Sequence, residues 1–163
     1  MTQLSSVTQE LAPILKEREQ TVCVAESSTG GLIAASLLAV PGASAYFIGG
    51  SVIYTARSRK ILLQVKREDL EGLEPLTEAM AAAFAKTARE QLKTTWAISE
   101  LGIAGPTPAR YGNPPGISVI AIDGPVCKTR VVETGSNDRE ANMWQFTKAS
   151  LELLREALVA QAN

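Results

Sequence analysis

Residues 21–38 read TVCVA-ESSTGG-LIAASLL, and this stretch decides the class of fold. Its first five residues are apolar and mostly β-branched, which predicts a buried strand. The ESSTGG segment has the polar and glycine residues of a turn. The apolar run that follows, as far as residue 40, is rich in alanine and leucine and predicts a buried helix, which Pro41 and Gly42 end. A strand that turns directly into a helix indicates an α/β arrangement.

The same criteria, applied outward from this stretch, predict the remaining elements. We expect helices at residues 4–15, 57–63, 77–92 and 137–160, and strands at residues 47–55, 94–101, 117–122 and 129–133. Thr77 is a candidate N-cap, and Asn137 or Asp138 could cap the closing helix. Helices alternate with strands in the first half, and a hairpin follows. The pattern predicts one α/β domain over residues 1–163, a three-layer α/β/α sandwich with a mixed sheet of about five strands.

The charge balance excludes some classes of partner. The chain has 163 residues with 16 basic and 17 acidic side chains, so its formal net charge is −1. No strong field of one sign is available to attract nucleic acid or a membrane surface. No apolar run is long enough to span a bilayer, and the N-terminus lacks the apolar segment of a signal peptide. We therefore expect a cytoplasmic protein with neither kind of partner.

The metal-ligating side chains are few. Cys23 and Cys127 both lie in apolar, strand-like runs, so we expect buried, reduced thiols rather than a disulfide framework. The chain has no histidine, and a metal site would have to rely on carboxylates. We expect neither a metal nor a cofactor.

Three segments could carry chemistry. The backbone N–H groups at the start of the helix after ESSTGG could bind an anion, although serine and threonine are also ordinary helix caps. The GIAGP sequence at residues 102–106 follows a strand and could donate N–H groups to a phosphate or carboxylate, or could simply be a turn. Tyr54 is followed by Arg57, Arg59 and Lys60, which could bind an anion or form a solvated surface helix.

These segments occur in an order that resembles the CinA C-terminal domain family, which includes the nicotinamide-nucleotide amidases. The resemblance covers roughly residues 5–158. It rests on VAESSTGG at 24–31, PGASAYF at 41–47, GSVIY at 50–54, GIAGP at 102–106 and the Pro115-Gly116 pair. It implies a three-layer α/β sandwich, in agreement with the pattern of elements.

The resemblance also implies an activity. Its amidases hydrolyse the carboxamide of nicotinamide mononucleotide, without a metal, to nicotinate mononucleotide and ammonia. A serine nucleophile activated by a lysine, with a tyrosine nearby, carries the reaction; the serine corresponds to Ser27 and the tyrosine to Tyr54. The implied catalytic set is Ser27, Tyr54, Arg59 and Lys60, and the implied substrate-binding set is Ser28, Thr29, Gly30, Gly31, Ser44, Gly102, Ile103, Ala104 and Gly105.

The chain departs from the family at the implied site. Arg59 stands where the family has its lysine, and arginine stays protonated and cannot act as a general base. Lys60 is one residue further on. Leu101 replaces a small hydroxyl residue before GIAGP, and Thr107-Pro108 replaces Asp-Gly after it. In the closing helix, Trp144 or Arg139 stands near the family's arginine.

Three functions remain open from the sequence. The first is an amidase that acts on nicotinamide mononucleotide or a related amide. The second is a catalytically inactive relative that binds a nucleotide or a protein partner, because the departures alter polar site positions and leave the scaffold intact. The third is a purely structural homo-oligomer. The arginine at position 59 predicts amidase activity that is absent or very weak.

Overall fold

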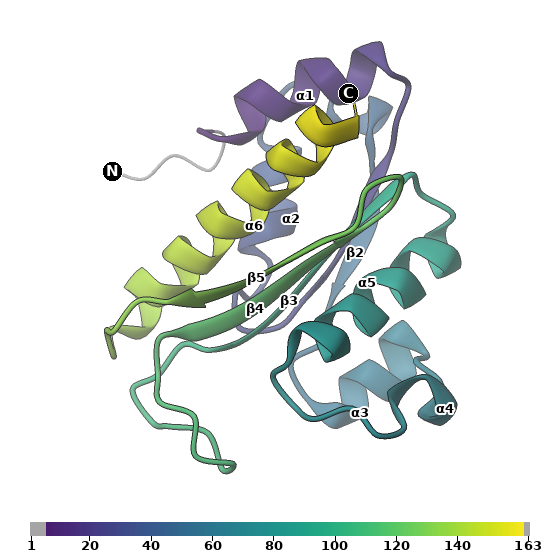
Figure 1. Cartoon of the computed structure of the whole chain (residues 1–163). Helices are drawn as coiled ribbons and strands as arrows, with labels where there is room; N and C mark the ends of the chain where they lie inside the picture. The colour runs from purple at the N-terminus through teal and green to yellow at the C-terminus, as the bar shows by residue number, and fades with distance from the viewer. Residues whose placement is uncertain (1–5, 162–163) are drawn as a thin grey trace.

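The computed structural model, which describes residues 6–161, has three layers with one sheet in the middle (Figure 1). The five strands lie in the order β2-β1-β3-β4-β5. They are β1 (Val22–Glu26), β2 (Phe47–Val52), β3 (Trp96–Ile103), β4 (Ile117–Asp123) and β5 (Lys128–Glu133). β1 is parallel to β2 and β3, whereas β4 is antiparallel to both β3 and β5. The predicted three-layer sandwich with a mixed sheet is therefore confirmed.

Helices cover both faces of the sheet (Figure 1). One face carries α1 (Thr8–Glu17), α2 (Leu32–Leu38) and α6 (Arg139–Gln161). The other carries α3 (Ala56–Ser58), the π-helical turn η2 (Arg59–Leu63), α4 (Arg67–Leu70) and α5 (Glu78–Leu92). A 3₁₀ turn, η1 (Ala43–Ala45), precedes β2. Leu4, which the sequence placed in the opening helix, lies outside the described residues.

The side chains of β3 alternate between two separate cores. Trp96 and Ile98 belong to the core under α1, α2 and α6, whereas Ala97 and Leu101 belong to the core under α5. This alternation follows from the two-residue period of a strand. Every residue of β1 is buried because this strand lies between β2 and β3 and has helices over both faces.

Tertiary pairing moved some of the predicted boundaries. β3 continues to Ile103, so two residues that we assigned to the GIAGP loop are part of the sheet, because Ile103 pairs with Ile117 of β4. Thr77 caps α5 as predicted, since its Oγ1 accepts a hydrogen bond from the N–H of Met80 at 3.3 Å. Of the two candidate caps for α6, it is Asp138 that accepts from the N–H of Ala141, at 3.1 Å.

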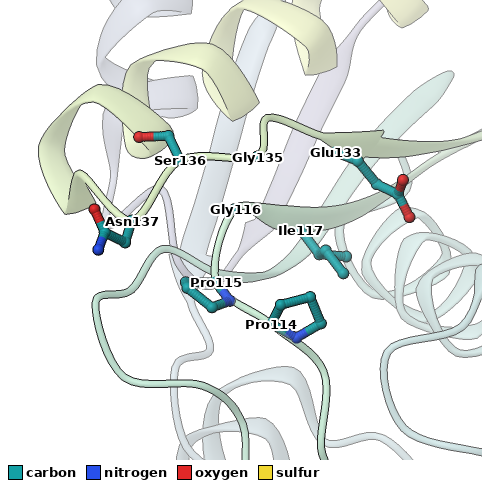
Figure 2. A pocket seen from close by; sticks show the side chains of 8 residues that line it. All are labelled: Pro114, Pro115, Gly116, Ile117, Glu133, Gly135, Ser136 and Asn137. Carbon is teal, nitrogen blue, oxygen red and sulfur yellow. The ribbon is translucent and has the colours of Figure 1, made fainter.

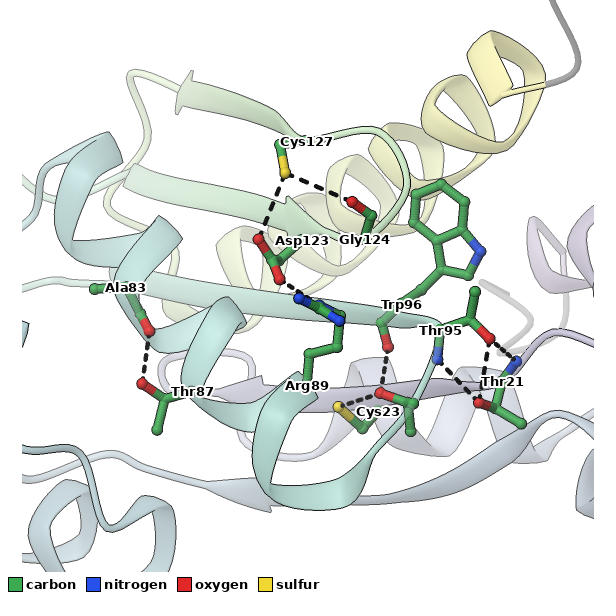
Figure 3. Close-up of polar contacts among 11 residues, drawn as sticks. Thr21, Cys23, Ala83, Thr87, Arg89, Thr95, Trp96, Asp123, Gly124 and Cys127 are labelled. Carbon is green, nitrogen blue, oxygen red and sulfur yellow. Dashed lines mark hydrogen bonds and ion pairs between the residues drawn. The ribbon is translucent and has the colours of Figure 1, made fainter.

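The two cysteines differ in their surroundings (Figure 3). Cys23 is buried in β1, where Thr94 Oγ1 donates to its sulfur at 3.2 Å and burial raises the pKa of the thiol. The prediction of a buried strand position was wrong for Cys127. It is exposed in the connection between β4 and β5, with its sulfur 3.5 Å from Asp123 Oδ1. The reason is that β4 ends at Asp123, so the apolar run around residue 126 spans a turn.

None of the helices within residues 6–161 combines the length and the apolarity that a membrane crossing requires. The longest, α6, has 23 residues and buries only one side against the sheet. Its outer side carries charged residues, including the Lys148–Glu152 ion pair at 3.8 Å.

The core under α1, α2 and α6 is expected to dominate stability. Ile98 is fully buried in it, so Ile98→Ala should lower the free energy of unfolding by about 2–5 kcal/mol. Ile48, on edge strand β2, is 49% exposed, and Ile48→Ala should cost less than about 1 kcal/mol. Urea denaturation of both variants measures the difference. Equal losses would contradict the assignment of Ile98 to the main core.

Candidate active site

The start of α2 is capped by a glutamate from the preceding strand. Glu26 is the last residue of β1, and its carboxylate accepts hydrogen bonds from the backbone N–H groups of Gly31 at 2.8 Å, Ile33 at 3.1 Å and Ala34 at 3.0 Å. These are the groups that the first turn of a helix leaves without partners. An internal carboxylate therefore occupies the place where we expected an external anion.

A second buried carboxylate, that of Glu100 in β3, holds the ESSTGG loop from the other side. Its Oε2 accepts from the N–H of Ser27 at 3.0 Å and the N–H of Thr29 at 3.1 Å, and Thr29 Oγ1 lies 3.0 Å from it. Its Oε1 accepts from the hydroxyls of Ser28 and Ser118. A buried charge is costly unless it is hydrogen-bonded, and these five contacts meet that requirement.

The expectation of an anion site at residues 27–31 is therefore wrong for most of the loop. Besides the N–H groups bonded to the two glutamates, the N–H of Gly30 donates to the carbonyl of Ser27 and that of Leu32 to the carbonyl of Thr29, each at 3.1 Å. The alternative of serine or threonine capping also differs from the structure, because the cap is Glu26. Neither glutamate was predicted as a loop-holding residue, although an acidic residue within an apolar strand, as in AISELGI, was a usable signal.

Thr29 links the two carboxylates. Its Oγ1 lies 2.7 Å from Glu26 Oε1 and 3.0 Å from Glu100 Oε2, and the two glutamates occupy paired positions in β1 and β3. Burial raises the pKa of Glu26, although the hydrogen bonds from Thr29 and from the backbone of α2 act in the opposite direction. The loop is thus fixed by two carboxylates at the carboxyl ends of adjacent parallel strands.

A cavity of about 450 Å³ opens beside this loop. It is lined by Ser28, Tyr54, Gly102, Ile103, Ala104, Gly105, Pro106, Thr107 and Arg139. Six of these are residues that the sequence assigned to catalysis or substrate binding. The cavity lies at the carboxyl ends of β1 and β3, the usual position of a ligand site in an α/β sheet.

Arg139 closes one side of the cavity. Its Nη1 donates to the carbonyl of Gly105 at 2.6 Å, and its Nη2 donates to the hydroxyl of Tyr54 at 3.2 Å. Of the two residues considered for the position of the family's arginine, the structure therefore places Arg139, and not Trp144, at the cavity. The guanidinium supplies a fixed positive charge there.

Gly102 has no room for a side chain. A Cβ at this position would lie 2.6 Å from Glu100 Oε1 and would also collide with Ser28 Oγ. The first glycine of the GIAGP motif is therefore required, because the Glu100 carboxylate and the Ser28 hydroxyl occupy the space that a side chain at position 102 would fill.

The two serines of the loop are placed differently. Ser28 lines the cavity and its hydroxyl donates to Glu100, whereas Ser27 is not among the lining residues. Ser27 is 4% exposed, and within residues 6–161 its hydroxyl has no hydrogen-bond partner. A serine nucleophile needs a base within hydrogen-bond reach, and none is in place at Ser27.

Arg59 and Lys60 point to different surroundings. Arg59 is partly buried; its Nε donates to the carbonyl of Ile53 at 3.1 Å, and its guanidinium carbon lies 5.3 Å from the centre of the Phe84 ring. Lys60 is exposed. The π-helical turn thus directs the arginine toward Phe84 of α5 and leaves the lysine in solvent. Burial lowers the pKa of Arg59, and nearby Tyr111 and Glu100 act in the opposite direction.

Ser44 does not join the cavity. It is exposed in η1, two residues before Tyr46, whose carbonyl accepts from the N–H of Val22 at the beginning of β1. The cavity lies at the other end of β1. Ser44 is therefore removed from the substrate-binding set.

A larger cavity, about 680 Å³, lies where the loop before β4 meets the loop after β5 (Figure 2). Its lining residues are Pro114, Pro115, Gly116, Ile117, Glu133, Gly135, Ser136 and Asn137. None of them is a predicted site residue, and the only charged side chain is the exposed Glu133. The smaller cavity, with its serine, tyrosine and arginine, is the better candidate for chemistry.

Comparison with known proteins identifies the class. The profile of the CinA C-terminal domain family matches residues 4–158. A CinA-like protein from Parasynechococcus marenigrum is 38% identical over 151 residues, which cover 91% of this chain and 36% of that protein. A CinA-like protein from Desulforapulum autotrophicum is 35% identical over 156 residues, which cover 95% of this chain and 37% of that protein. The chain thus spans a little over a third of the length of these relatives.

The fold agrees with this class. The competence damage-inducible protein A of Klebsiella pneumoniae has a solved structure with a TM-score of 0.88 and 26% identity, covering 97% of this chain and 98% of that one. The chain belongs to the CinA C-terminal domain family.

Glu100 is expected to be essential for the order of the loop. Glu100→Gln keeps one oxygen but brings an NH₂ group toward donors, so it should lower the free energy of unfolding by about 1–3 kcal/mol. Glu133→Gln, on the exposed face of β5, is the matched control and should change stability by less than about 0.5 kcal/mol. Urea denaturation compares them. Similar small effects would show that the five contacts to Glu100 contribute little.

The raised pKa of Glu26 should make stability depend on pH. The folded state holds this proton more tightly than the unfolded state, in which the pKa is about 4.3. The resulting stabilisation is complete below that pH and is lost as the pH rises through the folded pKa. Glu26→Gln lacks this dependence.

The comparison is made by urea denaturation of the wild type and Glu26→Gln from about pH 4 to pH 8. The stability of the wild type relative to the variant should fall as the pH rises and then become constant. A relative stability that rises with pH would mean that the hydrogen bonds outweigh burial at Glu26.

Proposed function

We propose that this domain binds a pyridine mononucleotide in the cavity beside the ESSTGG loop and that it hydrolyses the carboxamide weakly or not at all. The cavity carries the proposal, because it brings Tyr54, the GIAGP segment and Arg139 together at the carboxyl ends of parallel strands. Membership of the CinA C-terminal domain family, whose amidases act on nicotinamide mononucleotide, supports this class of ligand.

Binding of the phosphate is the part of the function that the site supports best. Arg139 is the only cation among the lining residues of the cavity and is oriented by Tyr54 and the Gly105 carbonyl. Arginine is well suited to phosphate because its planar guanidinium donates two parallel hydrogen bonds. The nucleotide would place its phosphate at Arg139 and its pyridine ring deeper in the site.

The hydrolytic step lacks a base. Amide hydrolysis by Ser27 requires a group that takes its proton, and a positioned base typically contributes about 10²–10⁴-fold. Arg59 stands at the position of the family's lysine and stays protonated, while Lys60 is exposed to solvent. Leu101 is buried in the core under α5 and offers no hydroxyl. These features favour the inactive relative over the active amidase.

Binding can be tested by calorimetry with nicotinamide mononucleotide. Arg139→Ala should weaken binding about tenfold or more, as loss of a charged hydrogen bond does. Arg57→Ala is the control, because Arg57 is an exposed arginine in α3 outside the cavity. Absence of binding by the wild type, or equal affinity in all three proteins, would overturn the proposed site.

Turnover is tested by ammonia release. The wild type should be at least about 100-fold slower than the double variant Arg59→Lys with Leu101→Thr, which restores the residue types of the amidases. Adding Ser27→Ala to the double variant should abolish the gain, whereas Ser28→Ala should reduce it less. Thermal denaturation checks that each variant is folded. Rapid wild-type turnover that survives Lys60→Ala would contradict the loss of the base.

A further inference from the structure

We infer that Ser28 and Glu100 form a nucleophile and base pair that hydrolyses esters carrying an anionic group. This activity goes beyond the proposed function and does not depend on it, because it requires only the cavity and the groups fixed around it. Ser28 lines the cavity, and its hydroxyl donates to Glu100 Oε1. A serine becomes a nucleophile when a base within hydrogen-bond reach takes its proton. That arrangement is present at Ser28.

The carboxylate of Glu100 is held so that one of its oxygens meets the serine. Its Oε2 accepts from the backbone N–H groups of Ser27 at 3.0 Å and Thr29 at 3.1 Å, which fix the orientation of the group. Its Oε1 accepts from the hydroxyls of Ser28 and Ser118. A nucleophile, a base and further groups that orient the base are the arrangement by which a reactive serine is recognised.

Ser118 can withdraw its hydrogen bond when Glu100 takes a proton. Its hydroxyl oxygen lies 3.1 Å from Glu100 Oε1 and 3.2 Å from the carbonyl oxygen of Leu101. A hydroxyl has one hydrogen, so it donates to one of these acceptors at a time. A hydrogen bond to a carboxylate stabilises the charged form. Transfer of the Ser118 hydrogen bond to the Leu101 carbonyl therefore favours proton transfer from Ser28 to Glu100.

The GIAGP segment supplies donors for the oxyanion that attack by a serine creates. Ala104 and Gly105 line the cavity, and their N–H groups donate to no acceptor within residues 6–161. The carbonyl of Ile103 accepts from the N–H of Gly116 at 2.8 Å. The carbonyl of Ala104 accepts from Asn142 Nδ2 at 2.9 Å. These bonds fix the two planar peptide groups that contain the free N–H groups. Donors fixed in advance stabilise an oxyanion most effectively.

Each turnover consumes one ester and one water. Ser28 Oγ bonds to the acyl carbon while its proton passes to Glu100 Oε1. The tetrahedral intermediate then expels the alcohol, which takes that proton. Water attacks the acyl-serine with Glu100 again as the base, and the departing Ser28 Oγ recovers the proton as the acid is released.

The ester and its charge follow from the groups at the cavity. A carboxylate is a weak base, so the reaction favours an ester, whose carbonyl is more electrophilic and whose leaving group departs more easily than that of an amide. Arg139 lines the same cavity and carries a positive charge. A substrate with a carboxylate or phosphate beyond the reacting carbonyl can pair with this guanidinium.

The nucleophile can be identified with a fluorophosphonate probe, which forms a bond to a reactive serine and releases fluoride. Tandem mass spectrometry of the labelled peptide should place the probe on Ser28. Ser28→Ala should lose the label, whereas Ser44→Ala, which changes an exposed serine at the other end of β1, should keep it. A label on Ser27, or no label on the wild type, would overturn the inference.

Turnover is measured with mono-4-nitrophenyl succinate, which carries a carboxylate, and with 4-nitrophenyl acetate, which carries none. Ser28→Ala should lower kcat/KM for both esters at least about 100-fold, and Glu100→Gln about 10²–10⁴-fold. Arg139→Ala should remove most of the preference for the succinate ester. Circular dichroism establishes which variants are folded. Wild-type rates in Ser28→Ala, or in folded Glu100→Gln, would overturn the assigned roles.

These experiments separate the inference from the proposed function. Neither ester contains a pyridine ring or a phosphate, so failure of nucleotide binding would leave a Ser28-dependent esterase standing. Binding of nicotinamide mononucleotide would in turn not rescue the inference if the wild type showed no Ser28-dependent ester hydrolysis. If Glu100→Gln does not fold, the labelled residue and the rate of Ser28→Ala still decide the outcome.

Discussion

The candidate site depends on two buried carboxylates at the carboxyl ends of adjacent parallel strands. Glu26 and Glu100 occupy paired positions in β1 and β3. Together they accept hydrogen bonds from most of the N–H and O–H groups of the ESSTGG loop and from the first turn of α2. The Thr29 hydroxyl lies between the two carboxyl groups, and donors from the loop, α2 and β4 reach their oxygens, which compensates for burying both groups. These contacts hold the loop in the conformation that places Ser28 beside the cavity.

Because of these two glutamates, the ESSTGG loop does not form the anion site that its sequence suggests. A helix start after a glycine-containing turn is ordinarily a place for anions. Here Glu26 of β1 supplies the carboxylate, so the N–H groups at the start of α2 are bonded within the protein and are not available to a ligand. Under the proposed function, the positive charge for a ligand comes instead from Arg139 at the start of α6, which lines the cavity. Ligand binding and loop stability would then depend on different groups.

Much of the fold and part of the site were predictable from local patterns. The strand, turn and helix of residues 21–38 and the cap at Thr77 follow from residue types at neighbouring positions. Tyr54 and the GIAGP segment entered the predicted site because they stand at strand ends and match the family motifs, and both line the cavity. Ser44 was misplaced because motif order does not indicate which end of a strand a residue adjoins. Cys127 was misplaced because an apolar run fits a turn as well as a strand.

The sequence by itself determined the layers, the mixed sheet and the presence of an arginine at position 59, since periodicity and residue type are local properties. Tertiary structure alone decided that Glu100 reaches back to the ESSTGG loop across 73 positions, because only the pairing of β1 with β3 brings the two together. It also decided that Arg139 closes the cavity and that Arg59 turns inward while Lys60 stays in solvent. The physical reason is that a side chain's direction is set by the register and helical turn of its element, which depend on partners distant in the chain.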